Sequence, residues 1–408
     1  MSSRNKVLLF STLNPYPFWA GSEKYWFDFI CRREAFGAFD FHVVLADSPV
    51  TRAKGKVLET LGIGTTFYRH FNVDFVRRNI YKVRDKFRAR QTRTLPWYDE
   101  IDRRRPDLVW FCVSTLTELT DLSYAVNICS RYEIPYWILV QHGYEDLFFS
   151  SEADLEAAAD VAISASTFIF IAERNRLTLE RAICRRLPNA FHSSNTLPQS
   201  KMDEAEDVAE RFPVDGQGVA RFFNLGRFSP ADKGQHLLVE AFAQPQWKER
   251  EWTLTFVGLD DFGRKYLERL AGLVTLDVGR LRFVPFVEEV FAEIARHDVL
   301  LMPSLAEGTP YALIESMACG RPAMGTPVGG IPELVLSGKT GWLARTTDIV
   351  DVEDALEKMW ADRPEFGRIG ENARQFVNTN YKSDIAAQEL LDRLRHDTSH
   401  DRKNLAAR

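Results

Sequence analysis

Short apolar runs alternate with longer amphipathic segments along both halves of this 408-residue chain. In the first half, the runs that predict buried strands fall at residues 6–12, 41–46, 107–113, 136–140 and 168–172. In the second half they fall at residues 221–226, 253–258, 281–286, 299–304 and 322–326. Strands that alternate with helices favour parallel, doubly wound sheets, and a chain of this length exceeds what one core usually covers. The sequence therefore predicts an α/β protein with two such domains.

The stretch at residues 196–218 separates the two sets of runs. It is acidic and ends in a Pro-Val-Asp-Gly sequence, which is typical of a turn. We interpret it as an interdomain linker between an N-terminal domain at residues 1–200 and a C-terminal domain at residues 218–380. Residues 383–396 predict a final helix, and residues 397–408 a frayed polar tail.

The composition is that of a globular protein able to bury large cores, with 45% hydrophobic and 12% aromatic residues. No run approaches the roughly 18 apolar residues that a membrane span needs, and the first residues do not lead into an apolar signal segment. The five cysteines are widely spread and form no Cys-x-x-Cys pair, which argues against a disulfide framework and a structural zinc site. We therefore expect a cytoplasmic protein.

The net charge of −5 conceals an asymmetry between the two halves. Residues 1–200 carry 26 Lys and Arg against 23 Asp and Glu (+3), and residues 201–408 carry 26 against 34 (−8). Between Arg69 and Arg93, nine basic residues and two aspartates are interspersed with apolar ones. A basic amphipathic helix of this kind is typical of a membrane-surface contact, and no nucleic-acid motif accompanies it. A solvated helix face remains the alternative interpretation.

Two glutamates, Glu307 and Glu315, frame the most informative stretch of the second half. The order is a strand, a Glu-Gly loop and a helix opening at Pro310, whose missing N–H suits a first helical turn. Unpaired N–H groups at a helix start favour a phosphate, and Gly308 would let it approach the backbone. The carboxylates suit sugar hydroxyls instead, so the pattern indicates a nucleotide-sugar. Glutamates that only complement the helix dipole are the alternative.

Further motifs surround this stretch. Residues 226–234 read Gly-Arg-Phe-Ser-Pro-Ala-Asp-Lys-Gly, residues 326–335 read Thr-Pro-Val-Gly-Gly-Ile-Pro-Glu-Leu-Val, and residues 338–343 read Gly-Lys-Thr-Gly-Trp-Leu. With these motifs the chain resembles the retaining glycosyltransferases of sequence family 4, over roughly residues 220–345. The resemblance implies the GT-B fold, in which two Rossmann-like domains face a central cleft. It also implies that residues 1–200 bind the acceptor, that residues 218–380 bind the nucleotide-sugar, and that a helix at residues 381–396 crosses back to the first domain.

The resemblance also assigns roles to the motif residues of the second half. Arg227 and Lys233, which follow Gly226, would bind the donor diphosphate through a guanidinium fork and a point charge. Glu315 would accept hydrogen bonds from the nucleotide ribose, and Glu307 would stabilise an oxocarbenium-like transition state. The sequence leaves open whether Glu307 is instead a nucleophile, as in retaining hydrolases. The intervening segment would contact the diphosphate and sugar: Gly308, Thr309, Pro310, Tyr311, Ala312 and Leu313.

Two motifs of the first half also resemble the family. His142 and Gly143 follow the apolar run at residues 136–140, at the end of a strand where parallel sheets bind ligands. The family often has a His-Gly here, close to the reacting sugar, so His142 joins Arg227, Lys233 and Glu307 as an expected catalytic residue. Gly21 and Ser22 resemble the family's Gly-Gly-x-Glu loop, with Ser22 replacing the second glycine, and are expected to contact the donor or acceptor.

We therefore expect a retaining glycosyltransferase that moves a sugar from a nucleotide diphosphate-sugar to a hydroxyl of a glycan or lipid-linked acceptor. No Asp-x-Asp metal motif stands out, and two fixed cations would neutralise the leaving group, so neither a metal nor a cofactor is expected. The basic stretch from Arg69 to Arg93 favours attachment to the inner face of a membrane, and no nucleic-acid partner is expected. An inactive GT-B scaffold, a GT-B sugar-nucleotide epimerase and a phosphorylase are the alternatives. The sequence leaves the donor base, the donor sugar and the acceptor open.

Overall fold

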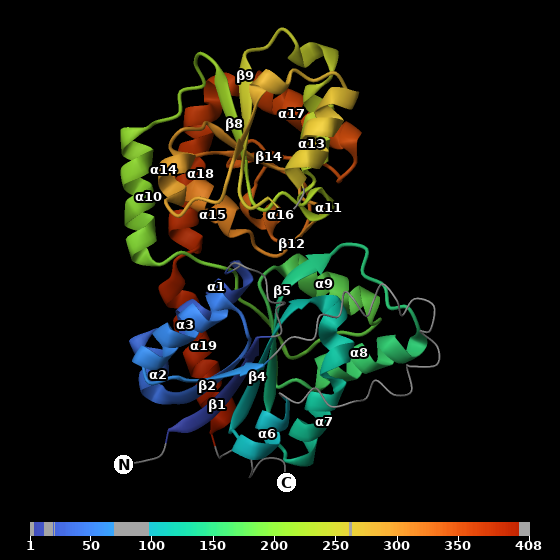
Figure 1. Cartoon of the computed structure of the whole chain (residues 1–408), viewed down its shortest axis with the longest axis vertical. Coiled ribbons are helices and arrows are strands. Elements are labelled where there is room, and N and C mark those ends of the chain that lie inside the picture. The colour runs from blue at the N-terminus through green and yellow to red at the C-terminus, as the bar shows by residue number, and fades with distance from the viewer. Residues whose placement is uncertain (1–3, 12–18, 20, 69–97, 261–262, 400–408) are drawn as a thin grey trace.

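A computed structural model describes residues 4–11, 19, 21–68, 98–260 and 263–399, with the backbone alone at residues 21, 22, 384 and 385. The basic stretch from Arg69 to Arg93 lies outside the described residues. Two parallel sheets, one from each half of the chain, are stacked end to end along the long axis (Figure 1). The predicted α/β architecture with two doubly wound sheets is therefore confirmed.

The first sheet has the strand order β3-β2-β1-β4-β5-β6-β7, and all of these neighbours are parallel. Its strands are β1 Asn5–Ser11, β2 Phe39–Ala46, β3 Gly64–Tyr68, β4 Leu108–Thr115, β5 Tyr136–Tyr144, β6 Thr167–Phe170 and β7 Ala190–His192. Five of them match the predicted runs. The edge strands β3 and β7 were missed, because their residues are mostly only partly buried and form no apolar run.

Helices cover both faces of the first sheet. They are α1 Gly21–Ile30, α2 Arg33–Ala38, α3 Pro49–Thr60, α6 Asp99–Arg104, α7 Ser123–Arg131, α8 Glu152–Ser164 and α9 Glu173–Ala182, with a 3-10 segment at Leu116–Leu122. Successive residues of β1 enter opposite cores: Leu8 packs toward α6, α7 and α8, whereas Leu9 packs toward α1, α2 and α3. Burial on both faces explains why the central strands are apolar throughout rather than alternating.

The second sheet has the order β10-β9-β8-β11-β13-β14, again all parallel. Its strands are β8 Ala220–Leu225, β9 Trp252–Val257, β10 Leu281–Val284, β11 Val299–Met302, β13 Ala323–Gly325 and β14 Gly341–Leu343. Its helices are α11 Pro230–Lys233, α12 Gln235–Phe242, α13 Gly263–Leu273, α14 Val290–Ile294, α15 Tyr311–Ala318, α16 Ile331–Leu334, α17 Ile349–Ala361 and α18 Phe366–Asn380. Adjacent residues Phe222 and Phe223 of β8 point into the two cores on opposite faces.

The stretch interpreted as a linker contains a helix, α10 Gln199–Arg211. Its Met202, Ala205 and Val208 recur at a spacing of three and are buried in the core of the second half together with α14 and α15. The linker interpretation was therefore wrong for this part of the stretch, because the acidic residues on the outer face of α10 concealed its short apolar stripe.

The final helix, α19 Ser383–Thr398, follows the second sheet in sequence but packs on the first (Figure 1). Leu390, Leu391 and Leu394 enter the same core as α1. The predicted frayed tail is wrong for Asp397, which is buried and accepts hydrogen bonds from Trp137 Nε1 at 2.8 Å and from Thr167 Oγ1 at 3.2 Å.

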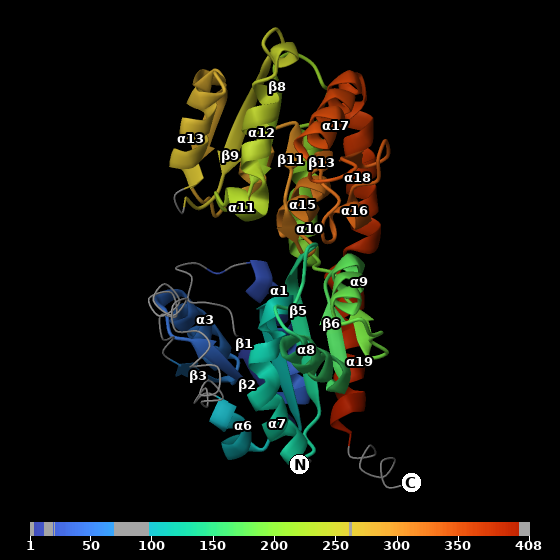
Figure 2. The same ribbon diagram turned by 90° about the vertical axis from the view of Figure 1, so that its right-hand side faces the viewer.

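A short strand, β12 Ala306–Glu307, joins the two halves of the molecule. It leaves the end of β11 and pairs antiparallel with the end of β5, so that Glu307 lies opposite Gly143 and Ala306 opposite Tyr144. The carboxyl ends of the two parallel sheets consequently face each other across this pairing (Figure 2). Within the described ranges, no helix is long and apolar enough to cross a membrane.

Candidate functional site

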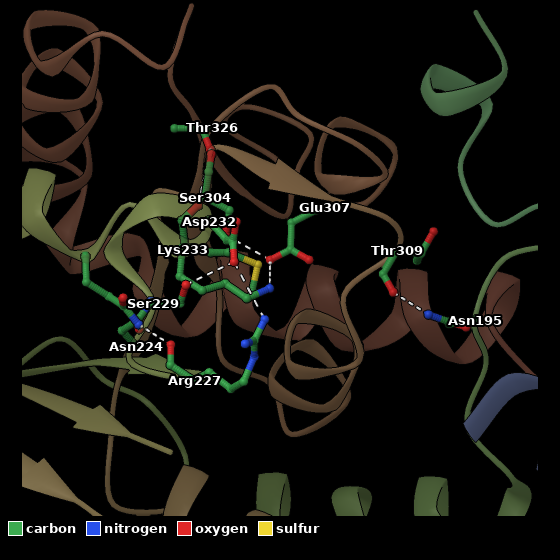
Figure 3. Close-up of polar contacts among 12 residues, drawn as sticks. Asn195, Asn224, Arg227, Ser229, Asp232, Lys233, Ser304, Glu307, Thr309 and Thr326 are labelled. Atoms are coloured by element: carbon green, nitrogen blue, oxygen red, sulfur yellow. Dashed lines mark hydrogen bonds and ion pairs between the residues drawn. The ribbon is translucent and has the colours of Figure 1, made fainter. Parts of the chain in front are cut away.

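Lys233 and Glu307 form the centre of the site. The Nζ atom of Lys233, at the end of α11, lies 2.5 Å from Oε1 of Glu307, and Ser304 Oγ donates to the same oxygen at 2.9 Å (Figure 3). The side chain of Glu307 is only 7% exposed. A buried carboxylate needs such partners to remain charged. The structure therefore joins the cation predicted for the diphosphate to the carboxylate predicted for the donor sugar.

Arg227 lies beside this pair in the loop that follows β8. Its guanidinium is 3.6 Å from Oδ2 of Asp232, which also accepts a hydrogen bond from Ser229 Oγ at 2.9 Å (Figure 3). From the other half of the molecule, the hydroxyl of Tyr144 donates to Oδ1 of Asp232 at 3.3 Å. Asp232 thus links Arg227 to the first sheet, a role that sequence reasoning missed although Asp232 lies inside the quoted motif at residues 226–234.

His142 approaches the same charges from β5. Burial lowers the pKa of its imidazole below the usual value; the Glu307 carboxylate opposes this shift, whereas the Lys233 ammonium reinforces it. The ring also meets Tyr144 edge-on, with the ring centres 5.3 Å apart. His142 is therefore neutral near pH 7 and lies within electrostatic reach of both halves of the ion pair. A Cβ at the neighbouring Gly143 would lie 2.7 Å from Asn175 Oδ1, which explains the glycine there.

The start of α15 follows directly from Glu307. Pro310 has a φ of −69°, and its carbonyl oxygen accepts from the N–H of Leu313 at 3.2 Å. It caps the helix from the position just before Tyr311, one residue earlier than the first-turn position predicted. The structure explains why residue 308 must be glycine by a contact that the sequence did not predict. A Cβ at this position would lie 2.1 Å from the carbonyl oxygen of Gln141 on β5. The Glu-Gly loop therefore packs against the backbone of the first sheet.

Two buried asparagines of the first half hold this loop in place. Asn195 Nδ2 donates to the carbonyl oxygen of Thr309 at 2.6 Å, and Asn175 Nδ2 donates to that of Glu307 at 3.3 Å. The hydroxyl of Thr309 donates to the carbonyl oxygen of Ile171. These contacts were missed, because an asparagine carries no sequence signal for a carbonyl group more than 100 residues away.

The two glycines of the motif at residues 326–335 pack on the other side of the loop. Gly329 has a φ of +49°, and a Cβ there would lie 2.4 Å from the carbonyl oxygen of Glu307. Gly330 N–H donates to the carbonyl oxygen of Gly308 at 2.6 Å. Both glycines are required because one backbone segment crosses another at van der Waals distance.

Glu333, in the same motif, contacts the first half of the molecule. It accepts a hydrogen bond from the backbone N–H of Glu173, at the start of α9, at 2.8 Å. His192 Nε2 lies 3.4 Å from its other oxygen, and this hydrogen bond raises the pKa of His192 above its usual value. Glu333 is therefore an interdomain contact rather than a residue at the Lys233–Glu307 centre.

Glu315 lies on α15, and its side chain is 15% exposed. Its ion-pair partner is Lys24 of α1, whose Nζ is 3.7 Å from Oε1 of Glu315. Gly21 and Ser22 are the first two residues of the same helix α1. The structure therefore places the helix that begins at Gly21 opposite Glu315, across the interface between the two halves. Lys24 itself was not among the predicted site residues.

The predicted residues thus fall into two groups. Arg227, Lys233, Glu307 and His142 surround one point between the sheets, whereas Glu315 with Tyr311 faces α1. Among the residues that the structure describes, no group of three or more His, Cys, Asp or Glu side chains is placed to hold a metal ion. The arrangement offers cations for an anionic group next to carboxylates for hydroxyl groups.

Part of the chain is similar in sequence to known glycosyltransferases. Residues 220–362 match the family model described as glycosyl transferases group 1. N-acetyl-alpha-D-glucosaminyl L-malate synthase of Bacillus anthracis is 33% identical over 125 residues, which are 31% of this chain and 32% of that protein. A GDP-mannose-dependent alpha-(1-6)-phosphatidylinositol monomannoside mannosyltransferase of Mycolicibacterium smegmatis is 31% identical over 170 residues, or 39% and 43% of the two chains. The matched segments span less than half of these relatives.

Solved structures match over nearly the whole chain. Anabaena Alr3699/HepE in complex with UDP has a TM-score of 0.68 at 18% identity, covering 95% of this chain and 99% of that one. A sucrose-phosphate synthase of Thermosynechococcus elongatus has a TM-score of 0.68 at 17% identity, covering 96% and 99%. At such identities the likeness concerns the fold. The chain therefore has the GT-B fold, and its residues 220–362 are similar to the group 1 glycosyl transferases.

Proposed function

We propose that this protein is a retaining glycosyltransferase that moves a sugar from a nucleotide diphosphate-sugar to a hydroxyl group of a glycan or lipid-linked acceptor. The observation that carries the proposal is the contact between Lys233 Nζ and Glu307 Oε1 at 2.5 Å. Arg227 and His142 lie beside this pair, and all four residues lie between the carboxyl ends of two doubly wound sheets. This edge is where open α/β sheets bind ligands. The family match over residues 220–362 covers every residue of this group except His142.

The donor would bind along the motif residues of the second half. Lys233 and Arg227 supply two positive charges for the diphosphate, and the start of α15 adds the positive end of a helix dipole. Both cations have carboxylate neighbours, Glu307 and Asp232, so they are held in position before a ligand arrives. Glu315, one and a half turns into α15, would accept hydrogen bonds from the ribose hydroxyls.

The transfer step would then need no covalent intermediate. The bond between the sugar carbon and the phosphate oxygen breaks, and its electron pair leaves with the diphosphate, whose charge Lys233 and Arg227 stabilise. The carboxylate of Glu307 stabilises the cationic sugar ring that results. The acceptor hydroxyl attacks from the face that the diphosphate leaves, and its proton passes to the departing phosphate oxygen. The neutral imidazole of His142 contributes hydrogen bonds to the sugar without adding charge.

We further propose that the acceptor lies at or near the inner face of a membrane. The support is the basic, aromatic-rich sequence from Arg69 to Arg93 on the acceptor side of the chain. A relative that shares 31% identity over 170 residues is named for a phosphatidylinositol mannoside substrate. A glycan acceptor that is linked to a lipid fits both observations.

Turnover with a panel of nucleotide-sugars tests the proposal. Release of nucleoside diphosphate together with a glycosylated acceptor is the expected result, and it should persist in the presence of EDTA. NMR coupling constants of the product should show the donor's anomeric configuration. Binding of nucleotides without turnover of any acceptor would favour the inactive scaffold, and conversion of the donor to its epimer would favour the epimerase. Sugar 1-phosphate formation from inorganic phosphate would favour the phosphorylase.

A further inference from the structure

Lys24 of α1 reaches across the interface to Glu315 of α15. Its Nζ lies 3.7 Å from Oε1 of Glu315 and 4.5 Å from the centre of the Tyr311 ring, which belongs to the same helix as Glu315. The 3.7 Å separation is that of an ion pair rather than of a short hydrogen bond. Since a carboxylate has about four acceptor positions, Glu315 can keep this ion pair and still accept hydrogen bonds from a diol.

The buried environment of Glu315 means that the ion pair with Lys24 affects the protonation state of the carboxyl group. Burial raises the pKa of Glu315 above its usual value, and the Lys24 ammonium opposes that shift. A protonated carboxyl donates one hydrogen bond and accepts fewer, so it is a poorer partner for two hydroxyl groups than a carboxylate. Removing the Lys24 charge would move the pKa of Glu315 further upward.

Other charged groups around Glu315 cannot replace Lys24. Lys201 of α10 acts on the carboxylate more weakly than Lys24 and also pairs with Glu204 at 2.5 Å. Asp28 lies one turn beyond Lys24 on α1 and interacts electrostatically with the Lys24 ammonium, so it competes for the same charge. Tyr311 on α15 and Cys319 just after it both have pKa values raised by burial and are neutral near pH 7.

We infer that Lys24 is a positioning residue for the donor nucleotide: from the other domain, it holds Glu315 as a carboxylate that can accept both ribose hydroxyls. The inference rests on the proposed function, because it assigns the ribose to Glu315. It adds that the N-terminal domain takes part in nucleotide recognition. Affinity for the ribose then depends on a residue outside the matched segment at residues 220–362.

The test compares a nucleoside diphosphate with its 2′,3′-dideoxy counterpart, which lacks the hydroxyls. UDP, GDP and ADP are screened by isothermal titration calorimetry, and the tightest is carried through with its dideoxy form at about pH 6 and about pH 8.5, on either side of the usual histidine range. The variants are Lys24→Met, Lys24→Arg and Glu315→Gln. The matched control is Lys54→Met on α3, whose Nζ lies over the ring of Phe27 at 5.1 Å and acts on Asp28 instead.

We expect Lys24→Met to weaken binding of the ribonucleotide roughly tenfold at about pH 6 and less than about threefold at about pH 8.5, since one unit of pKa corresponds to tenfold. Binding of the dideoxy nucleotide should not change, which also shows that the variant is folded. Lys24→Arg and Lys54→Met should behave as wild type. Glu315→Gln should remove the preference for the ribonucleotide at both pH values. Ionisation of the terminal phosphate is common to all proteins and cancels in the comparison.

Equal losses for both nucleotides, or equal losses at both pH values, would overturn the inference and leave Lys24 as an interdomain packing contact. An unchanged ratio of ribonucleotide to dideoxynucleotide affinity in Lys24→Met would overturn it as well. If wild-type protein binds no nucleoside diphosphate at all, the proposed function fails first, so the two failures are distinguishable.

Discussion

Lys233 and Glu307 are 74 positions apart in the sequence, yet the ammonium of one lies 2.5 Å from the carboxylate of the other. The pair is largely buried, with side-chain exposures of 21% and 7%. Each group therefore holds the other in position before any ligand binds. A donor diphosphate entering this site would share the Lys233 ammonium with Glu307. The ammonium would then lie between two anions, the diphosphate leaving group and the Glu307 carboxylate beside the sugar.

Removal of either cation should weaken donor binding. Lys233→Met or Arg227→Ala takes away one charge-assisted contact to the diphosphate, worth on the order of 1.5–3 kcal/mol, so nucleotide affinity should fall about tenfold or more. Lys233→Met should also lower stability, because Glu307 would be left buried beside fewer partners. Calorimetric titration measures the first effect and urea denaturation the second. The exposed Lys339 offers a control, as Lys339→Met should leave both unchanged. Unaltered affinity in both site variants would refute the assignment.

The two glutamates should separate turnover from binding. Glu307→Gln keeps the size of the side chain but removes the charge that stabilises a cationic transition state, so turnover should fall on the order of a hundredfold or more. Nucleotide affinity should change far less. Glu315→Ala should weaken nucleotide binding itself. Initial rates and calorimetric titrations on the same preparations check both statements. Small and equal effects of the two variants on both quantities would instead indicate glutamates that only complement the dipole of α15.

The end of α19 should contribute to stability despite its polar sequence. Asp397→Ala leaves the buried Trp137 indole N–H without its acceptor, which costs about 1–3 kcal/mol in the free energy of unfolding. Asp392 on the same helix pairs with Arg395 at 2.8 Å, but both side chains are more than half exposed, so Asp392→Ala should cost at most about 1 kcal/mol. Urea denaturation monitored by tryptophan fluorescence compares the two. Equal losses of unfolding free energy in the two variants would mean that the buried hydrogen bond of Asp397 stabilises the protein no more than the exposed ion pair of Asp392 does.

The interdomain pair of His192 and Glu333 should stabilise the protein most at low pH. The hydrogen bond to Glu333 raises the pKa of His192 above 6.5 in the folded state, so the protonated imidazole binds better in the folded than in the unfolded chain. This contribution is fully present below the unfolded pKa and is lost as the pH rises through the raised folded value. Because the His192 side chain is 39% exposed, its worth after solvent screening is below about 1 kcal/mol.

The variant His192→Asn isolates this contribution. The difference in unfolding free energy between wild type and His192→Asn should be largest at about pH 5.5 and should shrink toward about pH 8.5. Denaturation midpoints at a series of pH values provide the measurement. A difference that grows with pH would show that the imidazole is neutral in the folded state and that the sign of the shift is wrong.

The basic stretch from Arg69 to Arg93 should bind anionic bilayers. Nine basic residues against two aspartates give a charge of +7, and each basic residue near such a surface contributes up to about 1 kcal/mol. Sedimentation with anionic liposomes should therefore occur at low salt and decrease at high salt. Replacement of Arg77, Arg78, Lys82 and Arg84 by Glu should abolish it. Failure of wild type to sediment at low salt would leave a soluble acceptor or a protein partner for this stretch.

Local patterns in the sequence were sufficient for the central strands, because residues such as Leu8 and Leu9 are buried on both faces of a sheet and must all be apolar. The motifs at residues 226–234 and 307–315 could also be predicted from local sequence. Each consists of glycine, proline and charged residues at fixed spacing, and such a pattern reflects constraints within a single loop. Where burial was partial, as in β3, or where a polar face dominated, as in α10, the same reasoning missed the element.

The sequence by itself determined the two-sheet architecture, and its motifs predicted Arg227, Lys233, Glu307 and Glu315 as site residues. Only the tertiary structure decided which groups complete the site: Asn195 on the Glu-Gly loop, β5 against Gly308, and Lys24 on Glu315. These contacts join segments more than 100 residues apart, and their partners are backbone carbonyls or single charges. A hydrogen bond to a distant carbonyl constrains one side chain and leaves no periodic pattern, so the packing of the two domains alone reveals it.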